Sequence, residues 1–405
     1  MATIWAIGHA AFSSGPGVLW KSIDDGANWT NEGTICTSDL FVGYNGDGRR
    51  LGGVDADDMV YASGDNGIWR RTPEGGSWVQ VLAAGGNVYK SIFVIAADDI
   101  WAVGHTTGYA AVARHWNGSV WEDFSVASRA PMIGIGDTTQ HMSVWASGPN
   151  DVWVCGERDS KGPGPTEMWG YVIHTADGGT TWTDRSPNGM PQGATGPVKN
   201  ELAHMITGFA ADDVWICGDA ESGPFAFVHQ WTGSAWVDKS DATLNAAGES
   251  FRVIVGRSAS DIWVGSFDNE MVAHYDGASW TVIATPISTQ WGNYCGLALD
   301  GDKEVWFGCL HNSNPANVIQ SNRPPVTAFT NRHNASIVYS DMPCSLWAPD
   351  LPAPPVVPGY IITDLDPIED LEPISQQNDL AFNNNLTAIS PEDDPVIPPF
   401  SPPDP

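Results

Sequence analysis

The stretch DDVWICGD, residues 212–219, places a tryptophan inside an unbroken apolar run bounded by aspartates and a glycine. A near copy, DDIWAVGH, occupies residues 98–105. Short runs of β-branched and aromatic residues between turn-forming residues are typical of strands buried on both faces. Each copy of this octet therefore predicts one buried strand. We expect an Asp to bond turn amides at its start and a Gly to adopt positive φ at its end.

The octet recurs seven times along the chain. Its aromatic residue stands at Trp5, Tyr61, Trp101, Trp153, Trp215, Trp263 and Trp306. The spacing runs from 40 residues (61 to 101) to 62 residues (153 to 215). Repeats of this length built from short strands are typical of propeller blades, because each blade needs its neighbours to cover its faces.

Further strands surround each octet. The segments HWNGSVW (115–121), HQWTGSAW (229–236) and HYDGASW (274–280) each hold a glycine corner between apolar runs, which indicates a hairpin. Apolar segments such as residues 91–96 and 250–255 precede the octets, so one period holds four strands and leaves no room for helices. The chain opens on an octet, and we expect residues 335–340 to supply the missing strand and close the ring.

The sequence thus predicts an all-β fold. Residues 1–347 are expected to form a seven-bladed β-propeller of four-stranded antiparallel blades, followed by an extended Pro-rich acidic C-terminal arm at residues 348–405. The arm holds 14 prolines and 11 acidic residues but no Lys or Arg, which is typical of an extended chain. Its apolar residues are predicted anchors for another subunit: Tyr360, Ile361, Ile362, Leu380, Phe382, Val396, Ile397 and Phe400.

Two hairpins, residues 22–29 and 175–182, fit the pattern Ser/Thr-x-Asp-x-Gly-x-x-Trp. This pattern resembles the Asp-box of the BNR repeat superfamily, which occurs in sialidases, photosystem assembly factors and secreted propellers. The octet followed by HWNGSxW resembles bacterial and phage propeller repeats. The resemblance covers about residues 1–347 and implies architecture only. A sialidase would need an arginine triad, yet arginines are scattered and the Arg-Ile-Pro signature is absent.

The net charge, the first residues and the cysteines exclude several classes of partner and site. The formal charge of −30 comes from 48 acidic against 18 basic residues and excludes nucleic acid and anionic membranes as natural partners. The first residues lack a basic segment and a long apolar run, so neither a Sec signal peptide nor membrane insertion is predicted. The six cysteines show no metal-type spacing, and Cys155 and Cys217 occupy one octet position where small apolar packing is expected.

Histidines and tryptophans recur beside the hairpins. Equivalent positions in a ring of blades lie far apart, which argues against a shared metal. The histidines are therefore predicted to bond across strands, and the tryptophans to pack between blades. The histidines are His115, His174, His229 and His274, and the tryptophans are Trp29, Trp78, Trp121, Trp182, Trp236 and Trp280.

The position after the octet glycine is polar in most copies and predicts a polar ring on one face. Its members are His9, Asp65, His105, Glu157, Asp219 and Ser266. No metal or cofactor is predicted. Calcium is the alternative at this ring, since carboxylate oxygens are its usual ligands.

Insertions lie after the octet and between blades, two connections that share one side of a propeller. Insertions gathered on one face of a repeat protein usually mark its binding face. The candidate partner-binding residues there are Glu157, Arg158, Asp159, Lys161, Glu167, Trp169, Asp184, Arg185 and Lys199.

The sequence favours a non-enzymatic binding or structural propeller in a larger extracellular assembly. A phage virion component, in the tail or an appendage, is the leading hypothesis, anchored to other protein subunits through the arm. One alternative is an exported bacterial surface lectin or adhesin that binds cell-surface glycans. Another is a polysaccharide-active glycosidase with carboxylates among Glu157, Asp159, Glu167 and Asp184.

Overall fold

The computed structural model describes a defined part of the chain: residues 3–9, 16–39, 51–54, 59–71, 77–124, 138–159, 168–187, 201–220, 226–247, 250–266, 271–283, 285, 292–299, 305–311, 317–321, 329–331 and 342–347. The chain divides into two units, Met1–Pro354 and Pro355–Pro405, and every described residue belongs to the first. The predicted arm anchors lie outside the described residues.

Strands among the described residues form seven four-stranded antiparallel sheets, each a blade. Blade 1 holds β28 (Met342–Trp347), β1 (Ile4–His9), β2 (Pro16–Ser22) and β3 (Thr30–Asp39). Blade 2 holds β4 (Leu51–Val54), β5 (Met59–Gly64), β6 (Gly67–Arg71) and β7 (Trp78–Ala83). Blade 3 holds β8 (Asn87–Ala96), β9 (Asp99–Thr106), β10 (Ala111–Trp116) and β11 (Trp121–Asp123).

The remaining four blades follow in chain order. Blade 4 holds β12 (Thr138–Gly148), β13 (Asp151–Asp159), β14 (Met168–Thr175) and β15 (Thr183–Asp184). Blade 5 holds β16 (Glu201–Ala210), β17 (Asp213–Ala220), β18 (Ala226–Trp231) and β19 (Trp236–Asp238). Blade 6 holds β20 (Phe251–Ser258), β21 (Asp261–Ser266), β22 (Val272–Tyr275) and β23 (Trp280–Ile283). Blade 7 holds β24 (Gly292–Leu299), β25 (Val305–His311), β26 (Asn317–Ser321) and β27 (Phe329–Asn331).

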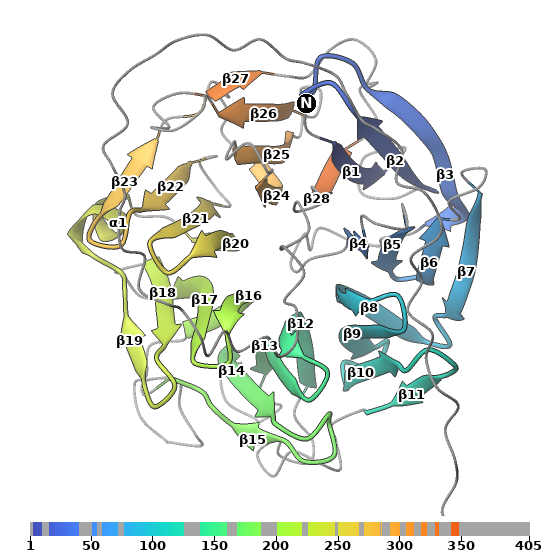
Figure 1. Cartoon of the computed structure of the whole chain (residues 1–405), viewed down its shortest axis with the longest axis horizontal. Coiled ribbons are helices and arrows are strands. Elements are labelled where there is room, and N and C mark those ends of the chain that lie inside the picture. Colours follow the sequence, from blue (N-terminus) through green and yellow to red (C-terminus); the bar gives the residue numbers. More distant parts are fainter. Residues whose placement is uncertain are drawn as a thin grey trace, which may run out of the picture. The chain divides into compact units, whose positions relative to one another are not determined.

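The blades stand around a common centre in the order of the chain (Figure 1). The first strand of each blade is innermost, and each inner strand contacts the next, including β24 with β28 and β28 with β4. The predicted seven-bladed β-propeller is therefore confirmed.

The octets are the second strands of the blades, as predicted. All seven octet aromatics are at most 2% exposed, because both faces of the second strand pack against neighbouring blades. Cys155 and Cys217 are also fully buried in apolar clusters, which confirms the expected packing role.

The strand that closes the ring differs from the prediction. β28 pairs with β1 and sets Trp347 opposite Trp5, whereas the predicted segment, residues 335–340, lies outside the described residues. Both segments are short and mostly apolar, so the sequence pattern does not choose between them. The pairing with β1 makes the choice.

The octet glycines are required by a close approach of the neighbouring strand, not by the predicted positive φ. A Cβ at Gly104, Gly156 or Gly218 would lie 1.8, 2.1 or 1.7 Å from a carbonyl oxygen of the adjacent first strand. The register between the two strands shifts beside each of these glycines, so a β-bulge brings that carbonyl onto the glycine. Positive φ occurs instead at hairpin glycines such as Gly118 and Gly277.

One short helix corrects the expectation of a purely β chain. Helix α1 (Ala242–Ala247) lies between blades 5 and 6. It forms because the Asp241 carboxylate accepts the backbone N–H groups of Thr243 and Leu244 at 2.8 and 3.0 Å, and because Leu244 is fully buried. Within the described residues, no helix has the length and apolar character needed to cross a membrane.

Candidate functional site

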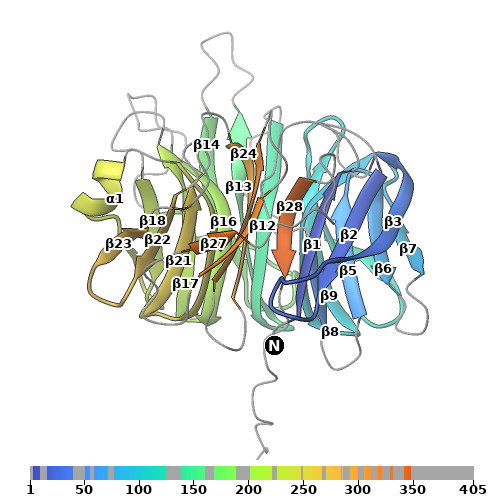
Figure 2. The same ribbon diagram turned by 90° about the horizontal axis from the view of Figure 1, so that it is seen from above.

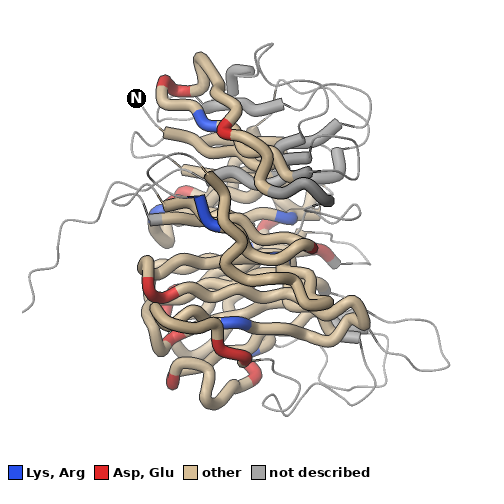
Figure 3. The backbone as a smooth tube through the Cα atoms, turned by 90° about the vertical axis from the view of Figure 1, so that its right-hand side faces the viewer, with Lys and Arg blue, Asp and Glu red and all other residues tan. Residues whose placement is uncertain are grey.

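The two ends of the blades carry different connections (Figure 2). We call one end the loop face: it holds the links between second and third strands, such as residues 107–110, and the links between blades. We call the other end the turn face: it holds the turns between first and second strands, such as residues 97–98, and the hairpins between third and fourth strands. Several acidic segments, red in Figure 3, lie along the turn face.

A polar cluster joins blades 5 and 6 near the loop face. The Asp219 carboxylate lies 3.2 Å from His204 Nε2 and 3.4 Å from Arg252 Nη2. Arg252 Nη1 also lies 3.1 Å from His204 Nδ1, and His204 is 1% exposed. His204 and Arg252 are the extra residues of the two first-strand bulges, which turn them towards this cluster. The cluster therefore fixes the two blades to each other.

A second polar cluster lies between blades 3 and 4. His141 is fully buried, its Nδ1 contacts the Tyr171 hydroxyl, and burial together with the nearby His105 lowers the pKa of His141 to about 3. The His105 ring stacks on Tyr109 at 5.2 Å between ring centres. The Tyr109 carbonyl accepts the Thr139 N–H of the next blade at 2.7 Å. His141 is consequently neutral at physiological pH.

The other members of the predicted polar ring have separate surroundings. The buried Glu157 carboxylate accepts a hydrogen bond from Gln140 at 3.0 Å, and the buried Ser266 bonds Met271 through its hydroxyl and its N–H. Asp65 lies half-buried in the turn between β5 and β6. The backbone of His9 ends β1, and its side chain lies outside the described residues. The contacts given for Glu157 and Ser266 lie within their own blades.

The predicted partner-binding residues fall into three groups. Lys161, Glu167 and Lys199 lie outside the described residues. Arg158, Asp159 and Trp169 are described by backbone only, at the loop-face ends of β13 and β14, where Arg158 pairs with Trp169. Glu157, Asp184 and Arg185 have described side chains.

Asp184 and Arg185 lie on the outer edge of blade 4, away from Glu157. The Asp184 carboxylate accepts both the N–H and the hydroxyl of Ser186. The Arg185 guanidinium lies 5.5 Å from the ring centre of Trp231 in blade 5, and its carbonyl accepts the Trp236 indole N–H. The contacts of Arg185 tie its blade to the next one.

The same contacts recur one blade later and reveal a motif that the sequence interpretation missed. Asp238 caps Ser240 at 2.8 Å, and the Lys239 carbonyl accepts the Trp280 indole N–H at 2.7 Å. The signal is Trp-x-Asp-x-Ser, present at residues 182–186 and 236–240.

The turn face carries a repeated Asp–His–Trp triad. In blade 4, Asp151 accepts hydrogen bonds from Trp153 Nε1 and His174 Nε2, both at 3.0 Å, and the imidazole stacks on the indole at 4.2 Å. Blade 6 repeats this arrangement with Asp261, Trp263 and His274. In blade 3, His115 bonds Asp99 at 2.8 Å and stacks on Trp101 at 4.4 Å. The predicted structural role of these three histidines is confirmed.

Blade 5 departs from the predicted alignment by one residue. Gln230, not His229, pairs with Trp215 and donates to Asp213 at 2.8 Å. The His229 ring instead lies tilted against Phe227, with 4.5 Å between the ring centres. The extra polar residue in HQW moves His229 to the other face of its strand.

The hydrogen bonds of the triads lower the pKa of their aspartates. Burial raises the pKa of Asp261, but hydrogen bonds from His274 and Trp263 and the charge of Arg257 outweigh burial and lower the pKa to about 2. Asp151 follows the same pattern, with burial opposed mainly by His174, and its pKa is also lowered. These carboxylates are therefore charged at neutral pH.

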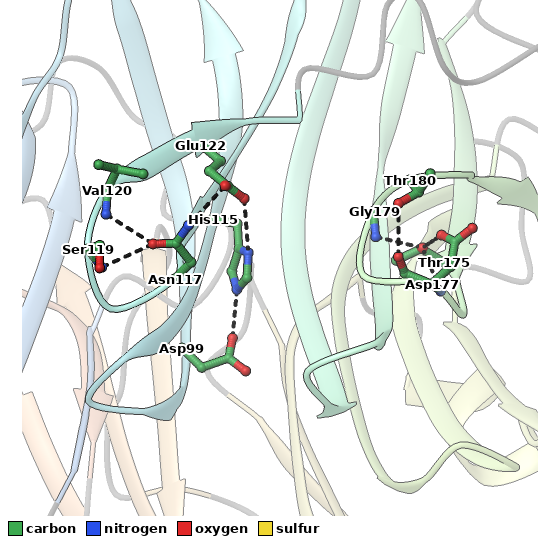
Figure 4. A network of polar contacts seen from close by, with 10 residues as sticks. All are labelled: Asp99, His115, Asn117, Ser119, Val120, Glu122, Thr175, Asp177, Gly179 and Thr180. Carbon is green, nitrogen blue, oxygen red and sulfur yellow. Dashed lines mark hydrogen bonds and ion pairs between the residues drawn. The ribbon is translucent and has the colours of Figure 1, made fainter. Parts of the chain in front are cut away.

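The hairpin corners are tightly hydrogen-bonded (Figure 4). In the hairpin at residues 175–182, the Thr175 hydroxyl donates to Asp177 at 2.8 Å and accepts the Gly179 N–H at 2.8 Å. The hairpin at residues 22–29 repeats both bonds from Ser22, each at 2.9 Å. Within the described residues, no group of three or more His, Cys, Asp or Glu side chains has the arrangement of a metal site.

Comparison with protein-family models and with curated proteins gives no match. Among solved structures, the chain is similar to a protein from Lactobacillus plantarum, with 12% identity over 86% of this chain and 99% of that one and a TM-score of 0.54. YCF48 from Cyanidioschyzon merolae has 13% identity, coverages of 73% and 88%, and a TM-score of 0.47. YCF48 bound to D1 peptide has 15% identity and a TM-score of 0.38; the match covers 58% of this chain and spans 65% of that one. Likeness at this identity shows the propeller fold alone.

Proposed function

We propose that this chain is a non-enzymatic propeller that binds a partner through its loop face. It serves in a larger extracellular assembly, the tail or an appendage of a bacterial virus, with the C-terminal arm as its link to other protein subunits. Its BNR-type repeats supply the scaffold.

The observation that carries the proposal is the length of the connections. In blades 3 to 6, the turns between first and second strands all have two residues: 97–98, 149–150, 211–212 and 259–260. The loop-face links between second and third strands vary, with four residues at 107–110, eight at 160–167 and five at 221–225. The longest connections, such as residues 124–137 and 185–200 between blades, also lie on the loop face. Long connections gathered on one face of a repeat protein support recognition there, because binding loops lengthen while the strands that hold them stay the same.

Immuno-electron microscopy with an antibody raised against the purified chain tests the assembly. We expect labelled tails or appendages on virus particles from a producing culture. Antibody adsorbed beforehand with the chain is the control. Label confined to the cell surface supports the lectin alternative, and unlabelled particles and cells contradict both.

A second experiment tests the arm. Virus particles that lack the protein receive either the full chain or a chain that ends at Trp347. We expect only the full chain to join the particles. Equal incorporation contradicts anchoring through residues 348–405.

One contact favours glycans as the ligand, as in the lectin alternative. Tyr109 is 49% exposed on the loop face, stacks on His105 and holds the positive φ of 61°, which is strained for a residue other than glycine. A rigid exposed tyrosine ring suits the apolar face of a sugar. On a glycan array, Tyr109→Ala is expected to lose binding while Val120→Ala, exposed on the turn face, keeps it. No bound glycan for the unaltered chain contradicts this alternative.

A further inference from the structure

The corner of the blade 3 hairpin holds an exposed Asn117–Gly118 pair in an unusual set of hydrogen bonds (Figure 4). Asn117 Oδ1 accepts the backbone N–H groups of Ser119 and Val120, both at 3.0 Å. Asn117 Nδ2 donates to Glu122 Oε1 at 2.9 Å. The side-chain amide is therefore held at its oxygen by two donors and at its nitrogen by a carboxylate.

We propose that Asn117 deamidates itself in the folded protein. The Gly118 backbone nitrogen attacks Asn117 Cγ and forms a five-membered succinimide ring. Negative charge develops on Oδ1 during this attack, where the two N–H groups already point, as donors do in an oxyanion hole. Gly118 has no side chain to hinder its nitrogen, and its φ of 86° favours glycine at this corner.

Glu122 supplies the proton transfer. As the new C–N bond forms, its carboxylate takes the proton of the Gly118 nitrogen and passes it to Asn117 Nδ2, which leaves as ammonia. His115 Nδ1 lies 4.0 Å from Glu122 Oε2, and His115 Nε2 bonds Asp99 at 2.8 Å, so the triad of blade 3 holds the relay in place. Water then opens the ring at either carbonyl and yields aspartate or isoaspartate. No oxidant or reductant takes part.

The other blades show what the aspartate product does to the hairpin. Blade 6 has Asp276 at the same corner, where the carboxylate accepts the N–H groups of Ala278 and Ser279 at 2.9 and 2.8 Å. Blade 5 has Thr232 there. Neither residue carries an amide to lose. Deamidation thus keeps the two turn bonds that Asp276 makes in blade 6, but it replaces the hydrogen bond from Nδ2 to Glu122 with a second negative charge, because blade 6 has Thr281 where blade 3 has Glu122.

Peptide mass spectrometry of the full chain during incubation at neutral pH tests the proposal. We expect succinimide, aspartate and isoaspartate at position 117, formed about tenfold faster in the folded chain than in the same chain unfolded in urea. Asn28, which is exposed and precedes Trp29, is the internal control and should stay unchanged. A folded rate at or below the unfolded rate overturns the proposal without any variant.

Glu122→Gln tests the relay. It keeps the side-chain size, and we expect it to lower the folded rate about tenfold while the unfolded rate stays the same. An unchanged folded rate overturns the role of Glu122. Asn117→Asp should melt no more than about 3 °C below the wild type, because it keeps the two turn bonds that Asp276 makes and the charge added beside Glu122 is exposed. A larger fall in the melting temperature overturns the claim that the aspartate product is accommodated.

Discussion

At several positions, the contact with a neighbouring strand determines which residue type fits. The octet glycine lies under a carbonyl of the bulged first strand, and the octet tryptophan lies under an imidazole of the third strand. The polar partner of the octet aromatic changes from blade to blade, as His174, Gln230 and Lys21 show. Lys21 Nζ lies 4.4 Å from the ring centre of Trp5, so a cation takes the place of the imidazole in blade 1.

Gly218→Ala tests the close approach. A Cβ there would lie 1.7 Å from the Leu202 carbonyl oxygen, so the bulge must shift, and we expect a loss of about 3 kcal/mol in the free energy of unfolding by urea titration. Gly148→Ala is the matched control, because nothing lies within 4 Å of its added Cβ. Equal losses in the two variants would contradict the contact with the Leu202 carbonyl as the reason for glycine at position 218.

Acid should weaken the triad of blade 6. The folded pKa of Asp261, about 2, lies below its usual 3.8, so its contribution is complete above about pH 4 and is lost as pH falls to about 2. The stability gap between wild type and Asp261→Asn should shrink by about 2 kcal/mol between pH 5 and pH 2. Asp212→Asn, on the exposed turn before β17, controls for the loss of one charge. A pH-independent gap would contradict the triad as its source.

Between elements, tryptophans connect the blades. The Trp after a hairpin packs edge-on against the octet Trp of the preceding blade: Trp29 on Trp306 at 6.5 Å, Trp182 on Trp101 at 6.1 Å and Trp236 on Trp153 at 6.2 Å. Edge-to-face contact of this kind stabilises aromatic pairs beyond their burial. The predicted packing of these tryptophans between blades is confirmed.

Two tryptophans allow packing and hydrogen bonding to be measured separately. Trp280 Nε1 donates to the Lys239 carbonyl at 2.7 Å, whereas Trp182 Nε1 has no hydrogen-bond partner among the described residues. Trp280→Phe should therefore cost about 1 kcal/mol more than Trp182→Phe in chemical unfolding. If the two variants lose the same free energy of unfolding, the hydrogen bond from Trp280 to the Lys239 carbonyl does not contribute to stability.

The whole propeller depends on its closure. β28 comes from the far end of the propeller sequence and pairs with β1, so each blade has a neighbour on both sides. In a closed ring, the innermost edge of each blade faces the central channel, where it is protected from pairing with another chain.

Two truncations test the closure. A chain that ends at Trp347 retains β28 and should keep the wild-type melting temperature. A chain that ends at residue 341 leaves β1 without its inner partner, and we expect a lower melting temperature and aggregation. Differential scanning calorimetry and light scattering measure both effects. If the two truncated chains melt and aggregate alike, another segment closes the ring.

The seven octets were enough to predict the blade count, because a strand buried on both faces is apolar throughout and is easily recognised in the sequence. The hairpins and apolar segments beside the octets predicted the four-stranded period. The triad histidines were also predictable, since Asp, Trp and His recur at fixed places. The β-bulges of the first strands were not predictable, because they depend on the register between two strands. The octet glycine is visible in the sequence, but the bulge that requires it is not.

Tertiary structure alone decided which segment closes the ring and which polar residues meet. His204, Asp219 and Arg252 come from three strands in two blades, and no spacing in the sequence marks their contact. Local pattern determines the strands because side-chain direction alternates along one chain. Contacts between blades depend on distances across the ring, which a linear pattern does not contain.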